Sequence, residues 1–237
     1  MTNTTPNGNA ALPELSEKGL LTPGNCVLAL IDYQPQMVFG VANIDRQSLI
    51  NNAVGLAKSA VTFGLPVILT TVETKGFSGA TSPHLTAALP GLAPIERTTM
   101  NAWDDANFVA AVQATGRKKL ILAGLWTEAC ITFPAVQAIQ DGYEVFVVAD
   151  ACGDVSDVAQ DMAMQRMIQA GARPVTWLQV LLELQRDWAH KGTYPAVMDI
   201  VKQHCGAYGA GVEYAYTMVH GAPATVYPEY KAAAAHA

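Results

Sequence analysis

The sequence contains few charged residues and no long apolar segment. Charged side chains make up 14% of the 237 residues, against about 25% in a typical soluble protein. Hydrophobic residues reach 51%, yet no apolar run approaches the roughly 20 residues that a helix needs to cross a bilayer. The apolar excess therefore does not indicate a membrane anchor. A large surface buried between subunits accounts for it better, so we expect a homo-oligomer.

Basic clusters and a secretory signal are missing as well. The net charge is −6 and Lys and Arg form no cluster, which argues against binding to nucleic acid or to anionic membranes. The N-terminal stretch MTNTTPNGNAALPELSEKG has neither the basic start nor the apolar core of a secretory signal. We therefore expect a cytoplasmic protein whose partner is a small-molecule substrate.

Motifs for cofactors, metals and disulfides are also absent from the sequence. No GxGxxG follows a strand-like segment, and no GxxxxGK precedes a Ser or Thr, so a nucleotide-binding Rossmann domain has no support. The histidines have neither HxH nor HxxxH spacing, and they are His84, His190, His204, His220 and His236. The cysteines form no CxxC pair, a pattern that favours reduced thiols in a cytoplasm, and they are Cys26, Cys130, Cys152 and Cys205. We predict neither a cofactor nor a metal.

Five short apolar segments recur along the chain, at residues 26–31, 66–72, 119–124, 144–149 and 173–177. They do not alternate with polar residues, as expected for strands covered on both faces of a parallel sheet. Helical segments that end on glycines separate most of them, at residues 46–64, 104–116 and 157–171. This alternation predicts an α/β fold, a three-layer doubly wound sheet that is mostly parallel.

The ends of the chain differ from its middle. No repeat or break in composition divides residues 20–190, so we expect one domain over residues 25–204. Residues 1–24 are polar, with Pro and Gly, and predict a flexible or wrapping arm. Residues 205–237 are rich in Gly, Ala and Tyr without helical periodicity. Such an extension is either disordered or ordered against a neighbouring subunit, and its tyrosines favour the second.

Candidate functional residues follow the predicted strands, because ligands of open α/β sheets bind beyond the carboxyl ends of the strands. Asp32 follows the first segment, Glu73 the second, and residues 126–130 the third. Asp150 and Cys152 follow the fourth segment. We interpret Asp150 as a helix cap, whereas no obvious helix start follows Asp32.

Cys130 is the candidate nucleophile. Pro134 is tolerated in the first turn of a helix, so a helix that starts near Ile131 would place Cys130 at its N-terminal end. That position lowers the pKa of a thiol and directs free backbone N–H groups at a ligand. A free cysteine is more often a small core residue. The location of Cys130 at the same sheet edge as Asp32 favours the nucleophile.

Three stretches of the sequence resemble the isochorismatase-like cysteine hydrolases, a family that includes nicotinamidases and N-carbamoylsarcosine amidohydrolase. They are LIDYQ at 30–34, GLWTEACI at 124–131 and AIQDGYEVFVVADA at 138–151. True isochorismatases lack this cysteine, so the resemblance implies the branch that uses a thiol. The sequence is most similar to the YcaC-like subgroup in four short segments, DYQ, NAWDDANF, WTEAC and LQRDW. That resemblance implies a large assembly, a tetramer or an octamer.

The resemblance implies a catalytic triad of Asp, Lys and Cys. Asp32 and Cys130 match, but Arg97 stands where the family has lysine. Arginine remains charged and cannot transfer a proton, and Lys75 is a weaker substitute. The family's nicotinamidases hold a metal through Asp, His and His. This sequence offers Glu73 and His84 without a DxH motif, so we predict no metal, and nicotinamide becomes a less favoured substrate.

The resemblance further implies an amidase mechanism, in which Cys130 forms a thioester with a small amide or carbamoyl compound. The backbone N–H groups of Trp126 and Cys130 would form the oxyanion hole, with a cis peptide between Leu125 and Trp126. Candidate pocket residues are Phe39, Glu73, Asn101, Trp103 and Trp126; for Phe39 and Trp103 core packing is an equal alternative. The substitution at Arg97 keeps a second hypothesis open, a non-catalytic oligomeric protein that binds a ligand or senses redox state through Cys130.

Overall fold

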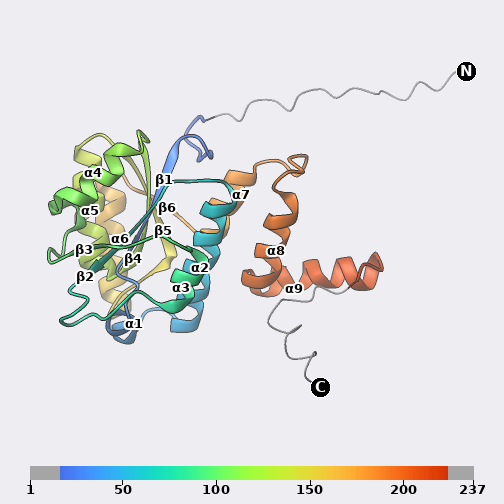
Figure 1. The fold of residues 1–237 in the computed structure, drawn as a ribbon, viewed down its shortest axis with the longest axis horizontal. Coiled ribbons are helices and arrows are strands. Elements are labelled where there is room, and N and C mark those ends of the chain that lie inside the picture. Colours follow the sequence, from blue (N-terminus) through green and yellow to red (C-terminus); the bar gives the residue numbers. More distant parts are fainter. Residues whose placement is uncertain (1–16, 224–237) are drawn as a thin grey trace, which may run out of the picture.

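A six-stranded parallel sheet runs through the part of the chain that the computed structural model describes, residues 17–223 (Figure 1). The strand order is β3-β2-β1-β4-β5-β6, and every neighbouring pair is parallel. The strands are β1 Cys26–Ile31, β2 Val67–Val72, β3 Ile95–Arg97, β4 Lys119–Leu125, β5 Glu144–Gly153 and β6 Arg173–Val175. The predicted doubly wound α/β fold is confirmed, and each of the five apolar segments forms a strand.

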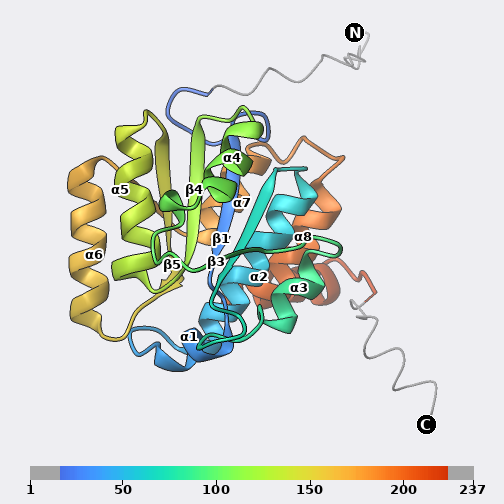
Figure 2. The ribbon, with the colours of Figure 1, turned by 60° about the vertical axis from the view of Figure 1, so that its left-hand side comes forward.

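Helices cover both faces of the sheet (Figure 2). Helices α4, α5 and α6 lie on one face, and α2, α3 and α7 lie on the other. The bounds are α1 Pro35–Gly40, α2 Arg46–Thr62, α3 Pro83–Ala88, α4 Ala106–Ala114, α5 Thr132–Gln140, α6 Asp157–Ala170, α7 Trp177–Gln185, α8 Tyr194–His204 and α9 Gly206–Tyr214. Three short helical turns complete the described chain: η1 Ala102–Asp104, η2 Thr127–Ile131 and η3 Ala215–Val219. No helix among the described residues is long and apolar enough to cross a membrane.

Strand β1 shows why the apolar segments do not alternate. Its six residues are all fully buried. Cys26, Leu28 and Leu30 pack into the core beneath α2 and α7. Val27, Ala29 and Ile31 pack into the opposite core, beneath α4 and α5. A strand covered on both faces needs apolar residues at every position.

Strand β3 was not predicted. It has only three residues, IER, and it pairs with β2 at the edge of the sheet. An edge strand this short carries no apolar run, so the hydrophobic pattern could not reveal it. Its register places Arg97 beside Val72, at the carboxyl end of β2.

Residues 206–219 of the C-terminal extension are helical although the sequence there has no helical periodicity, and its contact with a neighbouring subunit stays a prediction. Helix α9 packs on α8, and the two project away from the sheet (Figure 1). A Cβ at Gly209 would lie 2.3 Å from the carbonyl oxygen of Val201. The small residues of GAYGAG therefore allow close approach between the helices. Residues 1–16 of the expected arm and residues 224–237 lie outside the described residues.

Gly124 is required where β4 passes β1. Its φ is +153°, and an added Cβ would lie 2.1 Å from the carbonyl oxygen of Ile31. The two residues are paired in the sheet, so neither backbone can move without breaking the ladder. No side chain fits at this position.

We predict that Gly124→Ala lowers the free energy of unfolding by about 3 kcal/mol, the upper end for overpacking a core. Urea titration followed by circular dichroism measures this change. The matched control is Gly192→Ala, because nothing lies within 4 Å of a Cβ there. Equal urea midpoints for the two variants would contradict the assignment.

Candidate active site

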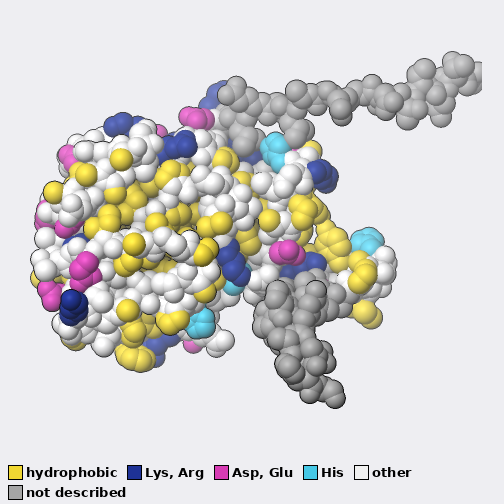
Figure 3. Space-filling view, viewed as in Figure 1, with side chains coloured by type: hydrophobic (Ala, Val, Ile, Leu, Met, Phe, Trp, Pro, Cys, Tyr) yellow, Lys and Arg dark blue, Asp and Glu magenta, His cyan; other side chains and the backbone are white. Residues whose placement is uncertain are grey.

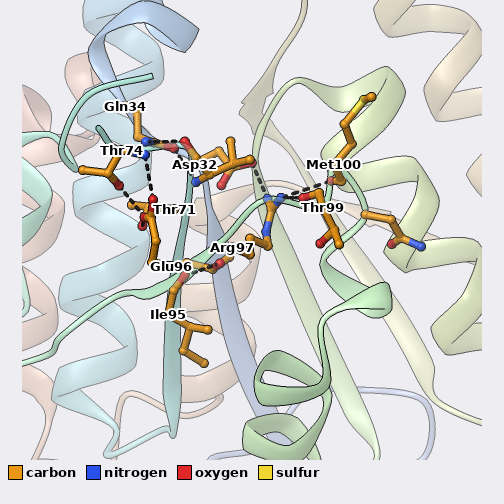
Figure 4. Close-up of polar contacts among 12 residues, drawn as sticks. Asp32, Gln34, Thr71, Thr74, Ile95, Glu96, Arg97, Thr99 and Met100 are labelled. Atoms are coloured by element: carbon orange, nitrogen blue, oxygen red, sulfur yellow. Dashed lines mark hydrogen bonds and ion pairs between the residues drawn. The ribbon is translucent and has the colours of Figure 1, made fainter. Parts of the chain in front are cut away.

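A buried ion pair lies at the carboxyl ends of β1 and β3 (Figure 4). Nη2 of Arg97 donates to Oδ2 of Asp32, and both side chains are fully shielded from solvent. Nη1 of Arg97 donates to the carbonyl oxygens of Thr99 and Met100. A buried guanidinium with several fixed acceptors cannot swing away, so Arg97 holds the Asp32 carboxylate in one orientation.

The chain around Asp32 is fixed by the glutamine two residues later. Asp32 has a left-handed backbone, with φ of +56°, and its N–H bonds the carbonyl of Thr70 at 3.1 Å. Beyond the strand, the buried side-chain amide of Gln34 forms the next hydrogen bonds to β2. Its Oε1 accepts from Val72 N–H at 3.0 Å, and its Nε2 donates to the carbonyl oxygens of Val72 and Gly79 (Figure 4). Gln34 thereby ties the end of β1 to β2 and to the loop beyond it.

Glu96, the residue before Arg97, ties β3 to the end of β2 and to the loop after it. Its carboxylate accepts from the Thr71 hydroxyl at 2.6 Å and from the Thr74 N–H at 2.7 Å (Figure 4). The Thr74 hydroxyl donates to it as well. These bonds lower the pKa of Glu96 despite its partial desolvation. Strand β3 is therefore held against β2 by side chains as well as by its short ladder.

Cys130 lies in η2, the helical turn between β4 and α5. The helical conformation begins at Thr127, with a π-helical turn that leads into α5. Helix α5 itself starts at Thr132 with Ile131 as its N-cap, so the predicted start near Ile131 is confirmed, whereas the π-helical turn before it was not predicted. Cys130 lies inside the first turn and is 5% exposed. The Leu125–Trp126 peptide bond is cis, as the resemblance implied.

The thiol and the ion pair influence each other's pKa values. Burial raises the pKa of Asp32 to about 6, and the Arg97 charge and a hydrogen bond from Cys130 oppose that rise. Burial raises the pKa of Cys130 to about 12, and the Asp32 charge acts in the same direction. The expected lowering of the thiol pKa was therefore wrong, because burial and the carboxylate outweigh the helix N-terminus. At pH 7 the site holds a carboxylate beside a protonated thiol.

Two polar atoms of this cluster remain available to a ligand. Oδ1 of Asp32 and Nε of Arg97 are buried without a well-formed hydrogen-bond partner among the described residues. Buried polar atoms of this kind are rare and need an explanation. The nearby backbone N–H of Trp126 lowers the pKa of the Cys130 thiol. A donor, an acceptor and a thiol thus lie together at the sheet edge.

The predicted pocket residues lie in different surroundings. Trp126 lies beside Cys130, and its Nε1 donates to the carbonyl of Met37 in α1 at 2.8 Å. Glu73 is exposed at the end of β2, where its backbone N–H bonds the Arg97 carbonyl at 3.1 Å. Phe39 is 74% exposed on α1 and borders a separate groove of about 980 Å³ between α2, α3 and α8. The core alternative for Phe39 therefore does not hold.

Asn101 and Trp103 are occupied by contacts of their own. The Asn101 side chain caps η1 through the Trp103 N–H and donates to Oε1 of Gln137 at 2.6 Å. The Trp103 indole donates to Asp141 at 2.7 Å and packs edge-on against Tyr143. The structure therefore favours core packing for Trp103.

The remaining predictions concern Lys75, Asp150, the cysteines and a metal. Lys75 is exposed in the loop after β2. Asp150 caps a helix as predicted, but the helix is α7, through the Trp177 N–H at 2.8 Å, rather than the next one, α6. The four cysteines form no disulfide. No group of three or more metal-ligating side chains occurs in residues 17–223.

Gln34, Glu96 and Asp154 were not identified from the sequence as parts of the site. Their hydrogen bonds join segments from 22 to 111 residues apart, and spacing along the chain gives no signal for such bonds. Gln34 had one available signal, its place in LIDYQ, the stretch that carries the resemblance.

Comparisons with known proteins agree with this architecture. The family described as "Isochorismatase domain" matches residues 26–179. The protein named "Probable hydrolase YcaC" of Escherichia coli K12 is 42% identical over 169 residues, 71% of this chain and 81% of that protein. Mouse isochorismatase domain-containing protein 2A is 30% identical over 190 residues, 78% of this chain and 86% of that protein.

Solved structures give the same assignment. YcaC from Pseudomonas aeruginosa, determined with hexane-2,5-diol and covalent acrylamide, has a TM-score of 0.78 and 36% identity, covering 84% of this chain and 97% of its own. The E. coli YcaC gene product, described as an octameric hydrolase of unknown specificity, has a TM-score of 0.80 and 36% identity. It covers 86% of this chain and 100% of its own. The chain with the buried Asp32, Arg97 and Cys130 cluster belongs to the isochorismatase domain family.

Proposed function

We propose that this protein is a cysteine hydrolase that cleaves the C–N bond of a small amide or carbamoyl compound. The observation that carries the proposal is the buried ion pair in which Arg97 holds the Asp32 carboxylate, with the buried Cys130 close enough for the Asp32 charge to raise its pKa. A nucleophile hydrogen-bonded to a base, with the base oriented by a third group, is the general arrangement for covalent catalysis. The covalent acrylamide of the Pseudomonas relative supports a reactive nucleophile in this subgroup, because acrylamide alkylates thiols.

Acylation begins with proton transfer from Cys130 to Asp32. The pKa of the thiol is about 12 and that of Asp32 about 6, so a free thiolate does not accumulate. The proton moves to Asp32 as the S–C bond to the substrate carbonyl forms. The carbonyl oxygen becomes an oxyanion, which the N–H groups of Trp126 and Cys130 stabilise. Asp32 then returns the proton to the nitrogen, the C–N bond breaks, and ammonia or an amine leaves.

Deacylation repeats the steps with water. Asp32, ionised again, accepts a proton from a water molecule that attacks the thioester carbonyl. The C–S bond breaks, the carboxylic or carbamic acid leaves, and the sulfur recovers the proton from Asp32. The reaction consumes one water and needs neither metal nor cofactor.

Arg97 has an electrostatic role in this mechanism. Its charge lowers the pKa of Asp32, which keeps the base ionised at neutral pH against the effect of burial. It cannot transfer a proton itself. All proton transfers are therefore assigned to Asp32.

A second candidate function rests on the same two departures from the expected chemistry. The arginine at position 97 suits a protein that binds a ligand, or senses redox state through Cys130, without turning over a substrate, and the raised pKa of Cys130 suits a thiol that takes no part in catalysis. The two functions differ in whether Asp32 assists the thiol, and the pH dependence of Cys130 alkylation separates them.

We predict that incubation of this protein with small carboxamides, ureido acids and hydantoin breakdown products releases ammonia or an amine from at least one of them. Cys130→Ala should abolish the release, because no other residue forms the thioester. Cys205→Ala is the matched control, since Cys205 is a half-exposed thiol at the start of α9. Product release that survives Cys130→Ala would refute the covalent mechanism.

The pH dependence of Cys130 alkylation by acrylamide tests the base. The rate should rise through a midpoint near pH 6, the pKa of Asp32, because ionised Asp32 accepts the proton. Arg97→Lys keeps the positive charge and should keep that midpoint. Arg97→Met removes the charge that lowers the pKa of Asp32, so the midpoint should move upward. A wild-type rate that rises only above about pH 8, like that of an ordinary thiol, would favour the second candidate function.

We also propose a homo-oligomer, a tetramer or an octamer, as the working form. The E. coli relative is described as octameric. In this chain, hydrophobic side chains lie exposed on the projecting helical arm formed by α8, α9 and η3 (Figure 3). They include Tyr214 at 61%, Met218 at 71% and Val219 at 64% exposure. Exposed apolar groups gathered on one element indicate a partner surface.

Light scattering at micromolar concentration should therefore give a mass several times 25.1 kDa. Replacing Tyr214 and Met218 together by Glu should reduce that mass, because two charges would have to be buried in the interface. Far-UV circular dichroism should remain unchanged, since both side chains are exposed within the chain. A wild-type mass of one chain would rule out the assembly.

A further inference from the structure

Asp154 is a fully buried carboxylate beside the nucleophile turn that the proposed mechanism does not use. Its Oδ2 accepts from the backbone N–H of Glu128 at 2.8 Å, and its Oδ1 accepts from its neighbour Val155 at 2.9 Å. Burial raises the pKa of Asp154, and these two N–H bonds oppose that rise. Both oxygens are therefore fully engaged, and one of them holds the turn that contains Cys130.

The main chain of Asp154 is held equally firmly. Its N–H donates to Oδ1 of Asn43 at 2.6 Å, and its carbonyl accepts from Ala42 N–H at 2.8 Å. Residues 42 and 43 lie between α1 and α2. Asp154 is consequently fixed to the segment between α1 and α2 as well as to the nucleophile turn.

The turn itself depends on the end of β5. The first N–H groups of a helical segment have no partner within the helix, and Glu128 N–H is one of them. The hydroxyl of Thr127 also reaches β5, where it donates to the carbonyl of Gly153 at 3.2 Å. A charge-assisted bond from a carboxylate is about twice as strong as a neutral one. Asp154 thus supplies the strongest of these contacts, and its bond holds the turn at Glu128, two residues before Cys130.

We infer that Asp154 is a positioning residue for Cys130: it anchors the nucleophile turn so that the thiol keeps its place near Asp32. The inference rests on the proposed function, because it assumes that the contact between thiol and carboxylate is productive. Asp154 does not touch the reacting atoms. It acts through the Glu128 backbone, and its removal should uncouple Cys130 from Asp32 without removing either group.

The chain provides a matched control in Asp150. That carboxylate also lies in β5 and also accepts one helix N–H at 2.8 Å, but from Trp177 of α7, on the other face of the sheet. Asp150→Ala therefore removes a carboxylate cap of the same kind and reports the general effect of losing one. Only the Asp154 cap touches the turn of Cys130.

The experiment compares acrylamide alkylation of Cys130 in the full-length wild type, Asp154→Ala, Asp154→Asn and Asp150→Ala. Peptide mass spectrometry gives the rate at Cys130 from pH 5 to 9. In Asp154→Ala the pH 7 rate should fall about 10²-fold, as expected for a displacement near 1 Å. Its remaining pH dependence should be that of an unassisted thiol, without the midpoint near pH 6. Asp154→Asn keeps an acceptor for Glu128 N–H and should recover most of the loss, and Asp150→Ala should match the wild type.

The outcomes separate the inference from the function on which it rests. A wild-type profile without the midpoint near pH 6 would refute the assistance by Asp32, and with it the proposed function. A wild-type profile with that midpoint that persists unchanged in Asp154→Ala would overturn the role of Asp154 alone. Equal losses in Asp154→Ala and Asp150→Ala would also overturn it, because they would reflect general destabilisation.

Discussion

The buried ion pair between Asp32 and Arg97 is the interaction on which the rest of the site depends. An unpaired carboxylate in this position would be protonated at neutral pH or would destabilise the fold, because burial of an isolated charge is costly. Arg97 keeps the carboxylate ionised, and it reaches Asp32 because β3 pairs with β2 at the edge of the sheet. The geometry of the sheet thus determines the charge of the proposed base.

Around this pair, three side chains tie neighbouring segments together at the carboxyl edge of the sheet. Gln34 ties the chain after β1 to β2, and Glu96 ties β3 to the loop after β2. Asp154 ties β5 to the nucleophile turn after β4. Such bonds let short connecting segments keep a fixed shape at the one edge of an open sheet where a ligand can enter.

The sequence predicted the fold, Asp32 and Cys130 from local patterns, and it predicted Arg97 through the family resemblance alone. CVLALI has no polar position, as a strand buried on both faces requires, and Asp32 and Cys130 follow strands directly. Strand β3 could not be predicted, since three residues at an edge need no apolar run. The pKa of Cys130 was misjudged because it depends on burial and on Asp32, 98 residues away in the chain. Asp154 was missed for a similar reason, since its partners come from two other segments.

The central claim is that Asp32 makes a buried thiol the most reactive one in the chain. Competition between the cysteines for limiting acrylamide at pH 7 tests this most directly, with peptide mass spectrometry to identify the alkylated residue. Exposure alone would favour Cys205, which is half-exposed, over Cys130, which is 5% exposed. Our account predicts that Cys130 is modified first and that Asp32→Asn removes its advantage. Modification of Cys205 before Cys130 in the wild type would contradict the account.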